Sequence, residues 1–179
     1  MKMKSLMLGT LLGGLAAFGW STLSWEVIGW HEKTMLAFRN DEEVAAVISS
    51  HTVRDGTYIL PYASSPPDAK SMERMARGPI VVAAVRRGGF GSFGKAMASQ
   101  VASLFGAAFL LTWLVLQTGG LSYGRRVLFL GVVGLAASVI VDLPNMNWWG
   151  FSGSFTAVNL ADNTVTWLLA GLAIAKVAK

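Results

Sequence analysis

The chain consists of long apolar segments separated by one extended polar stretch. Apolar character is nearly continuous in four segments, at residues 5–25, 94–117, 127–143 and 155–178. About 20 apolar residues cross the hydrocarbon core of a bilayer, so each segment is long enough for a transmembrane helix. The pattern predicts an all-α membrane protein with four transmembrane helices, arranged as a first helix (1–25), a polar insertion (26–92) and a three-helix region (93–179).

The polar insertion carries shorter patterns that predict a small α+β structure. A helix should begin at Asn40, because an asparagine cap followed by acidic residues favours a helix N-terminus. Residues 57–60 and 80–85 have the β-branched and aromatic composition of strands, and residues 71–77 could form two helical turns. Two strands alone are only marginally stable in water. We therefore expect the insertion to pack against the membrane helices or against another protein.

Composition supports the membrane assignment and removes several functional classes. The chain is 53% hydrophobic and only 14% charged, against about 25% charged in soluble domains. The net charge of +5 arises from scattered basic residues, so no nucleic-acid-binding patch is expected. The chain has no cysteine, which excludes disulfides, thiolate metal sites and cysteine nucleophiles.

The short basic segments predict the orientation in the membrane. With four crossings, one side would hold Lys2, Lys4, Arg125, Arg126, Lys176 and Lys179. Basic residues accumulate on the cytoplasmic side, so both termini should be cytoplasmic and the insertion extracytoplasmic, although Arg86, Arg87 and Lys95 count against this. The first apolar run is longer than the 7–15 residues usual in a signal peptide, so we interpret it as an uncleaved first span.

Small residues recur every four positions in two of the predicted spans. The first stripe is Gly9, Gly13 and Ala17, and the second is Gly94, Ala98, Ala102 and Gly106. Such stripes let another helix approach closely in lipid, so both are predicted packing faces. The alternative for the first stripe is a glycine-rich span without a packing partner.

Tryptophan clusters mark the ends of the predicted spans. Trp20, Trp25 and Trp30 follow the first span, and Trp148 and Trp149 follow the third. Indole rings favour the headgroup region, so these five residues are predicted interface anchors. The aromatic segment 145–151 could instead form a lip that binds a lipid or a partner, but anchoring is the simpler interpretation.

Asp162 is the most informative polar residue of the predicted spans. It lies about seven residues into the fourth span, where an ionised side chain is costly and usually functional. Asn159 and Thr166 share its helix face, and Gln100 of the second span lies at a similar depth. These four residues form a candidate intramembrane polar site. The simpler alternative places the helix start near Asn163, with Asp162 as its N-cap.

No catalytic signature emerges from the sequence. Gly89, Gly94 and Lys95 fit part of a phosphate-binding loop, but Ala96 replaces the required hydroxyl and a predicted span follows. His31-Glu32 lacks the second histidine of a metalloprotease motif. We therefore expect no catalytic residues, metal or cofactor.

Several motifs together resemble a known group of proteins. They are SWEVIGWHEKTM, DEEVAAVI, DGTYILPY, ARGPIVVAAVRRGG, LPNMNWWGFSGSFT and WLLAGLAIA. This set resembles a family of small, functionally uncharacterised bacterial inner-membrane proteins with one span, an extracytoplasmic insertion containing a G-x-Y-x-x-P segment, and three further spans. The resemblance covers most of the chain and implies the same topology and location, without an activity.

These observations predict a non-enzymatic subunit of the bacterial inner membrane. Its partners would be the bilayer and other membrane protein subunits, or a second copy, in an accessory or assembly role. The first alternative is a small oligomeric transporter or ion- or proton-handling protein that uses the polar face of the fourth span. The second is a membrane enzyme that acts on lipid headgroups through Asp142, Asp162 or His31.

Overall fold

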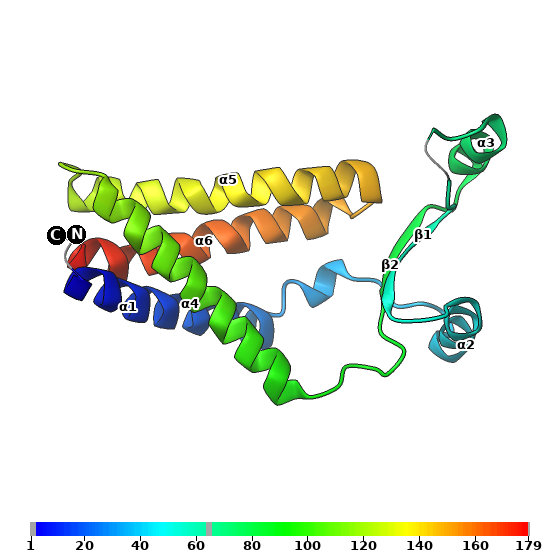
Figure 1. Ribbon diagram of the computed structural model, residues 1–179, viewed down its shortest axis with the longest axis horizontal. Coiled ribbons are helices and arrows are strands. Elements are labelled where there is room, and N and C mark those ends of the chain that lie inside the picture. Colours follow the sequence, from blue (N-terminus) through cyan, green and yellow to red (C-terminus); the bar gives the residue numbers. More distant parts are fainter. Residues whose placement is uncertain (1–2, 64–65, 179) are drawn as a thin grey trace. The chain divides into compact units, whose positions relative to one another are not determined.

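The computed structural model describes residues 3–63 and 66–178 and is predominantly helical (Figure 1). Its elements in chain order are α1 (Met3–Thr22), α2 (Asp41–His51), β1 (Gly56–Leu60), α3 (Ala69–Arg77), β2 (Val81–Val85), α4 (Phe93–Gln117), α5 (Tyr123–Trp149) and α6 (Gly153–Val177). The chain forms two compact units. Of the described residues, 3–35, 92–144 and 152–178 form the helical unit, and the remainder form the second unit.

The prediction of four membrane-length helices is confirmed. α4, α5 and α6 are long and apolar enough to cross a membrane, and so is α1 together with a π-helical turn at Leu23–Ile28. The first candidate span therefore ends at Ile28 rather than at Trp25. Residues 26–35 group with the helical unit, so the second unit begins ten positions later than the predicted insertion. Lys2 and Lys179, used to predict orientation, lie outside the described residues.

α5 is longer than the sequence predicted. Pro144 was expected to end the third span near Leu143, but the helix continues through it to Trp149. A proline removes its own N–H from the hydrogen-bond ladder, and transmembrane helices tolerate this loss because neighbouring groups satisfy the freed carbonyl. Gly150, with a left-handed φ of 75°, then ends the helical path. The predicted loop at 144–154 therefore shrinks to Gly150–Ser152.

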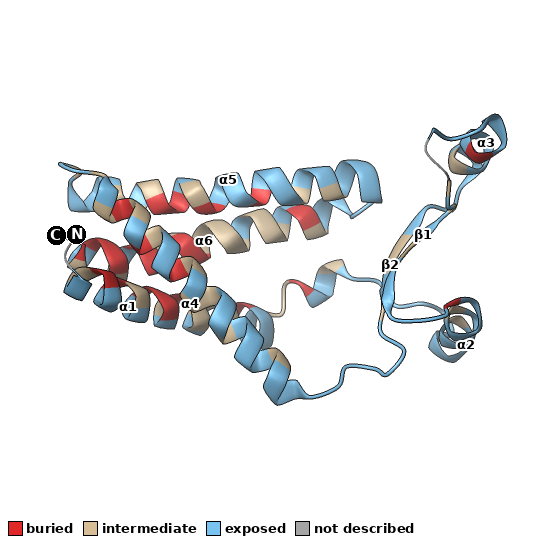
Figure 2. Ribbon diagram, in the orientation of Figure 1, coloured by how far each residue is buried: buried red, intermediate tan, exposed pale blue. Residues whose placement is uncertain are grey.

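The small residues of α1 lie against α4 and α6. A Cβ atom at Gly9 would fall 2.4 Å from Thr112 of α4, and one at Gly13 would fall 2.6 Å from Ile174 of α6. Ala17 is fully buried in the hydrophobic core. The first predicted stripe is therefore a packing face within this chain, and Figure 2 shows buried residues along α1.

The second stripe has a different environment. Gly94, Ala98, Ala102 and Gly106 are all exposed, and a Cβ atom at Gly106 would have no neighbour within 4 Å. α4 instead buries Ala108, Thr112 and Val115, which lie on another face of the helix. The stripe on α4 therefore lies on the surface of the described helical unit.

α5 and α6 pack through glycines on both helices. A Cβ atom at Gly131 would lie 2.4 Å from Leu168, and one at Gly134 would lie 2.6 Å from Trp167. Gly171 of α6 in turn lies against Leu130. Close backbone approach compensates in lipid for the missing hydrophobic driving force, so these contacts position the polar residues of α6.

The second unit has the predicted order of helix, strand, helix and strand. β1 and β2 pair antiparallel, with Gly56 opposite Val85 and Leu60 opposite Val81. Asn40 caps α2 by accepting a hydrogen bond from the Glu43 N–H at 3.2 Å. In the described part of this unit, the buried residues are the polar Thr52 and Ser71. The described part of the unit thus has no buried apolar core of its own.

Candidate functional site

Asp162 lies inside α6 and does not cap it. The helix begins at Gly153, and the Oγ atom of Ser152 accepts a hydrogen bond from the Phe155 N–H at 3.2 Å. Ser152 is therefore the N-cap, and the interpretation of Asp162 as the N-cap is wrong. The physical reason is that Ser152 follows the sharp turn at Gly150 and offers a hydroxyl cap earlier in the chain. Asp162 is thus a carboxylate within a candidate membrane span.

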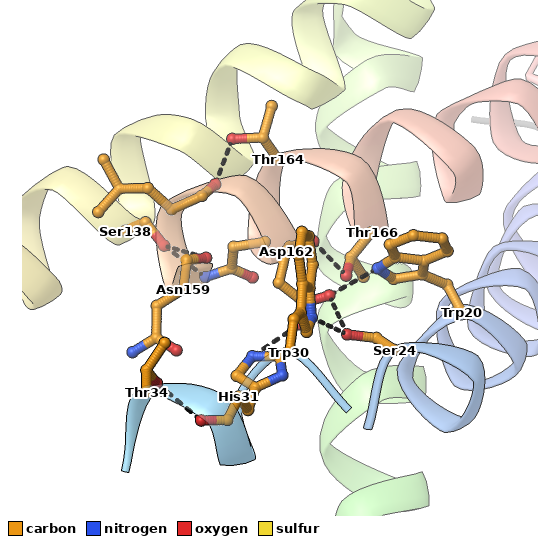
Figure 3. Close-up of polar contacts among 12 residues, drawn as sticks. Trp20, Ser24, Trp30, His31, Thr34, Ser138, Asn159, Asp162, Thr164 and Thr166 are labelled. Atoms are coloured by element: carbon orange, nitrogen blue, oxygen red, sulfur yellow. Dashed lines mark hydrogen bonds and ion pairs between the residues drawn. The ribbon is translucent and has the colours of Figure 1, made fainter. Parts of the chain in front are cut away.

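The carboxylate of Asp162 binds side chains from the end of α1 and the segment after it (Figure 3). Its Oδ1 atom accepts hydrogen bonds from Trp20 Nε1 and from Ser24 Oγ, each at 2.7 Å. Its Oδ2 atom lies 3.7 Å from His31 Nε2. Trp30 Nε1 donates to the same Ser24 hydroxyl at 2.7 Å. The Asp162 side chain, only 16% exposed, thus joins α6 to three positions between Trp20 and His31.

His31 is enclosed by tryptophan rings. Only 2% of the residue is exposed, and the Trp25 ring stacks on the imidazole with centroids 4.0 Å apart and planes inclined by 6°. Trp30 meets the imidazole edge-on at 5.8 Å, and Trp20 meets Trp30 edge-on at 6.4 Å. These three tryptophans, here called the tryptophan cluster, shield the His31–Asp162 pair from water.

The local sequence explains how these residues converge. Trp20 and Ser24 are four positions apart, which places them on one helix face. The helical path ends at Gly29, whose φ of 60° is left-handed and whose N–H donates to the Ser24 carbonyl at 3.2 Å. Glycine adopts this conformation without a steric cost. The turn brings Trp30 and His31 back over α6. The Thr34 hydroxyl then donates a hydrogen bond to the His31 carbonyl at 2.7 Å.

Burial sets the protonation of His31. Loss of hydration lowers the pKa of His31 below its ordinary value, and the nearby Asp162 carboxylate opposes this effect only in part. The imidazole is therefore neutral near pH 7. Its Nδ1 atom is buried and has no hydrogen-bond partner in the described part of the chain. An Nε2–H tautomer directs its proton toward Asp162 and leaves Nδ1 as an unsatisfied acceptor.

A second polar network connects α6 to α5. Asn159 Nδ2 donates to Asp142 Oδ1 at 3.3 Å, and Asn163 Nδ2 donates to Ser138 Oγ at 2.9 Å. The predicted polar face of the fourth span is thus divided, with Asn159 directed to α5 and Asp162 to α1. Thr166 donates to the Asp162 carbonyl of its own helix at 2.8 Å.

Gln100 is not part of this site. Among the described residues no hydrogen bond joins it to Asp162, and it lines a groove between the C-terminal part of α1 with the turn after it and the start of α4. Trp20, Ser24 and His31 were not predicted as partners of Asp162. The four-residue spacing of Trp20 and Ser24 was the available signal, but it did not identify the carboxylate they bind.

The remaining predicted site residues have simpler environments. Trp148 and Trp149 lie in the last turn of α5 and are exposed, so their anchoring role stays a prediction. Within residues 3–63 and 66–178, no group of three or more His, Cys, Asp or Glu side chains is placed to hold a metal ion.

No protein-family model, curated protein or solved structure matches the chain. The chemistry of the site is therefore the guide to function. A buried carboxylate beside an imidazole can fix two segments to each other or exchange a proton. Asp162→Asn keeps an oxygen acceptor for Trp20 and Ser24 but cannot exchange a proton, so this substitution separates the two possibilities.

Proposed function

We propose that this protein is a non-enzymatic subunit of a bacterial inner-membrane complex, with an accessory or assembly role. The observation that carries the proposal is the second unit, whose described apolar residues are all exposed or half-buried. Apolar strands and helices become stable when a second surface covers them. A partner protein that binds this unit would supply that surface.

The exposed stripe on α4 supports the same function. The stripe on α1 is occupied by α4 and α6, whereas the residues of the stripe on α4 are exposed. Small residues at a helix surface permit close packing of a further helix in lipid. The second unit and the stripe would then contact partner subunits outside and inside the bilayer.

The basic residues support an orientation with both termini in the cytoplasm. Tyr123 of α5 donates a hydrogen bond to the Leu172 carbonyl at 3.1 Å, and Arg126 donates to the Ala178 carbonyl. The start of α5 therefore adjoins the end of α6, which brings Arg125, Arg126 and Lys176 to one end of the helical unit. The positive-inside rule assigns this end to the cytoplasm.

The test is purification from native membranes in a mild detergent, with mass spectrometry of the co-eluting proteins. We expect stoichiometric membrane partners with the unaltered protein and their loss from the Ala98→Leu/Ala102→Leu variant. Ser103→Leu is the matched control, because it places the same side chain at another exposed position of α4. Elution without partners, or retention of partners in the stripe variant, would contradict the proposal.

A second candidate function, proton handling, is favoured by the buried His31–Asp162 pair. Its test is the decay of an imposed pH gradient in liposomes that contain the purified protein. A proton pathway through this pair predicts faster decay than in empty liposomes and a return to the empty rate in Asp162→Asn. Asp41→Asn, an exposed change in α2, is the control. Equal rates for the unaltered protein and Asp162→Asn would exclude this function.

A further inference from the structure

A groove lies between the outer part of α1 and the beginning of α4, both within the helical unit. Its volume is about 480 Å³. Apolar side chains form much of its wall, with Phe18 and Trp25 on one side and Phe93 and Met97 on the other. Polar groups of Ser21, Thr22, Glu26 and Gln100 complete the lining. The groove thus suits a molecule that is partly apolar and partly charged.

Trp25 connects this groove to the buried site. One face of its ring stacks on His31, yet the residue remains 43% exposed and lines the groove. The stacking fixes the orientation of the indole, so the groove has a rigid aromatic wall. The face of an indole attracts organic cations such as ammonium groups.

Glu26 makes the groove negatively charged. Of the lining residues it is the one with a charged side chain, and no ion pair joins it to another described residue. A carboxylate beside an indole is the chemistry that recognises an ammonium group. The same carboxylate repels an anionic headgroup.

The position of the groove identifies the source of the ammonium group. The candidate span of α1 ends at Ile28, and that of α4 begins at Phe93, so the groove lies where both spans reach the membrane surface. Phospholipid headgroups occupy this depth. Phe18 and Met97 continue the groove into the span region and offer apolar surface to an acyl chain.

We propose that this groove binds one zwitterionic phospholipid through its ammonium headgroup. The ammonium group contacts Glu26 and Trp25, and the upper part of an acyl chain follows Phe18 and Met97. The hydroxyls of Ser21 and Thr22 are available to the glycerol and phosphate oxygens. This site does not depend on a partner protein, so it stands apart from the proposed subunit role.

The test measures lipid retention by native mass spectrometry of the purified full chain. The protein in detergent is supplied with phosphatidylethanolamine or with phosphatidylglycerol of identical acyl chains. We expect one phosphatidylethanolamine to be retained in preference to phosphatidylglycerol. Glu26→Gln should reduce this retention roughly threefold, in keeping with the strength of an exposed ion pair. Glu26→Lys should shift the preference toward phosphatidylglycerol.

Controls separate the groove from general effects. Glu32→Gln removes an equal charge at an exposed position outside the groove lining and should leave retention unchanged. Circular dichroism confirms that each variant keeps its helical content. Equal retention of both lipids, equal losses in Glu26→Gln and Glu32→Gln, or equally strong binding of free phosphoethanolamine would each overturn the proposal. The last outcome would show that the headgroup alone, and not a lipid, is the ligand.

Discussion

The helical unit and the second unit are stabilised in different ways. The helical unit brings backbones together through glycines and buries a continuous core that includes Leu130, Ala170 and Ile174. The second unit buries only Thr52 and Ser71 among its described residues. It depends on helix caps, strand pairing and local contacts such as the bond from the Arg87 N–H to Asp55 Oδ1 at 2.9 Å. The contrast shows that one chain can contain a helical part with a buried apolar core and a part whose described residues bury no apolar side chain.

The largest expected effect comes from disrupting the close packing of α1. Gly13→Leu places a branched side chain where a Cβ atom already falls 2.6 Å from Ile174. Overpacking of this kind costs about 1–3 kcal/mol, so the free energy of unfolding in detergent should fall by about that amount. Gly19→Leu is the matched control, because a Cβ atom at Gly19 meets nothing within 4 Å. Equal losses in the two variants would show that α1 does not pack through this face.

Removal of the Asp162 carboxylate should have the next largest effect. Asp162→Ala leaves Trp20 Nε1 and Ser24 Oγ without their acceptor, and an unsatisfied buried polar group costs about 1–3 kcal/mol. We expect lower unfolding stability and altered tryptophan fluorescence, since Trp20 loses its hydrogen bond. Asp41→Ala, an exposed change in α2, should alter neither quantity in the helical unit. An unchanged fluorescence spectrum in Asp162→Ala would contradict the observed site.

The pH dependence of the free energy of unfolding should be the next largest effect. Because burial lowers the pKa of His31 in the folded chain, the unfolded chain binds a proton more readily than the folded chain. His31 therefore costs no stability above about pH 6.5, and stability falls as the pH drops through that value toward the lower pKa of the folded state. The slope cannot exceed about 1.4 kcal/mol per pH unit for one group.

Two histidine variants test this assignment by thermal unfolding between pH 5 and 8. His31→Gln should flatten the slope near pH 6, whereas His51→Gln, at an exposed position of α2, should leave it unchanged. A slope that survives in His31→Gln would assign the pH dependence to other groups.

The smallest expected effect is confined to the second unit. The Oδ1 atom of Asp68 accepts a hydrogen bond from the Ser71 N–H at 2.7 Å and so caps α3. The hydrogen bonds with Ser71 also hold the pKa of Asp68 below its ordinary value. Asp68→Ala should speed hydrogen exchange in the first turn of α3 and leave α1 and α6 unaffected. Faster exchange in the helical unit as well would show that the two units are energetically coupled.

Local signals explain which parts of the structure could be predicted from the sequence. The four spans follow from apolar runs, and the start of α2 follows from Asn40 and its acidic first turn. Pro144 misled the prediction of α5, because the local rule for soluble helices does not include the constraint that lipid imposes on the backbone. The partners of Asp162 could not be predicted, since Trp20 and Ser24 lie more than 130 positions away. Their proximity is set by the packing of α1 against α6, which no local pattern in either segment encodes.

The contacts of α1 also have a consequence for biosynthesis. α1 is synthesised well before Ile174, the α6 residue that fills the space beside Gly13. Until Ile174 has been synthesised, this face of α1 therefore contacts lipid or the insertion machinery. Trp20, Ser24 and His31 likewise cannot contact Asp162 until α6 has entered the bilayer. Closure of this hydrogen-bonded site thus follows the synthesis of α6, and it makes α1 dependent on a helix that lies far downstream in the chain.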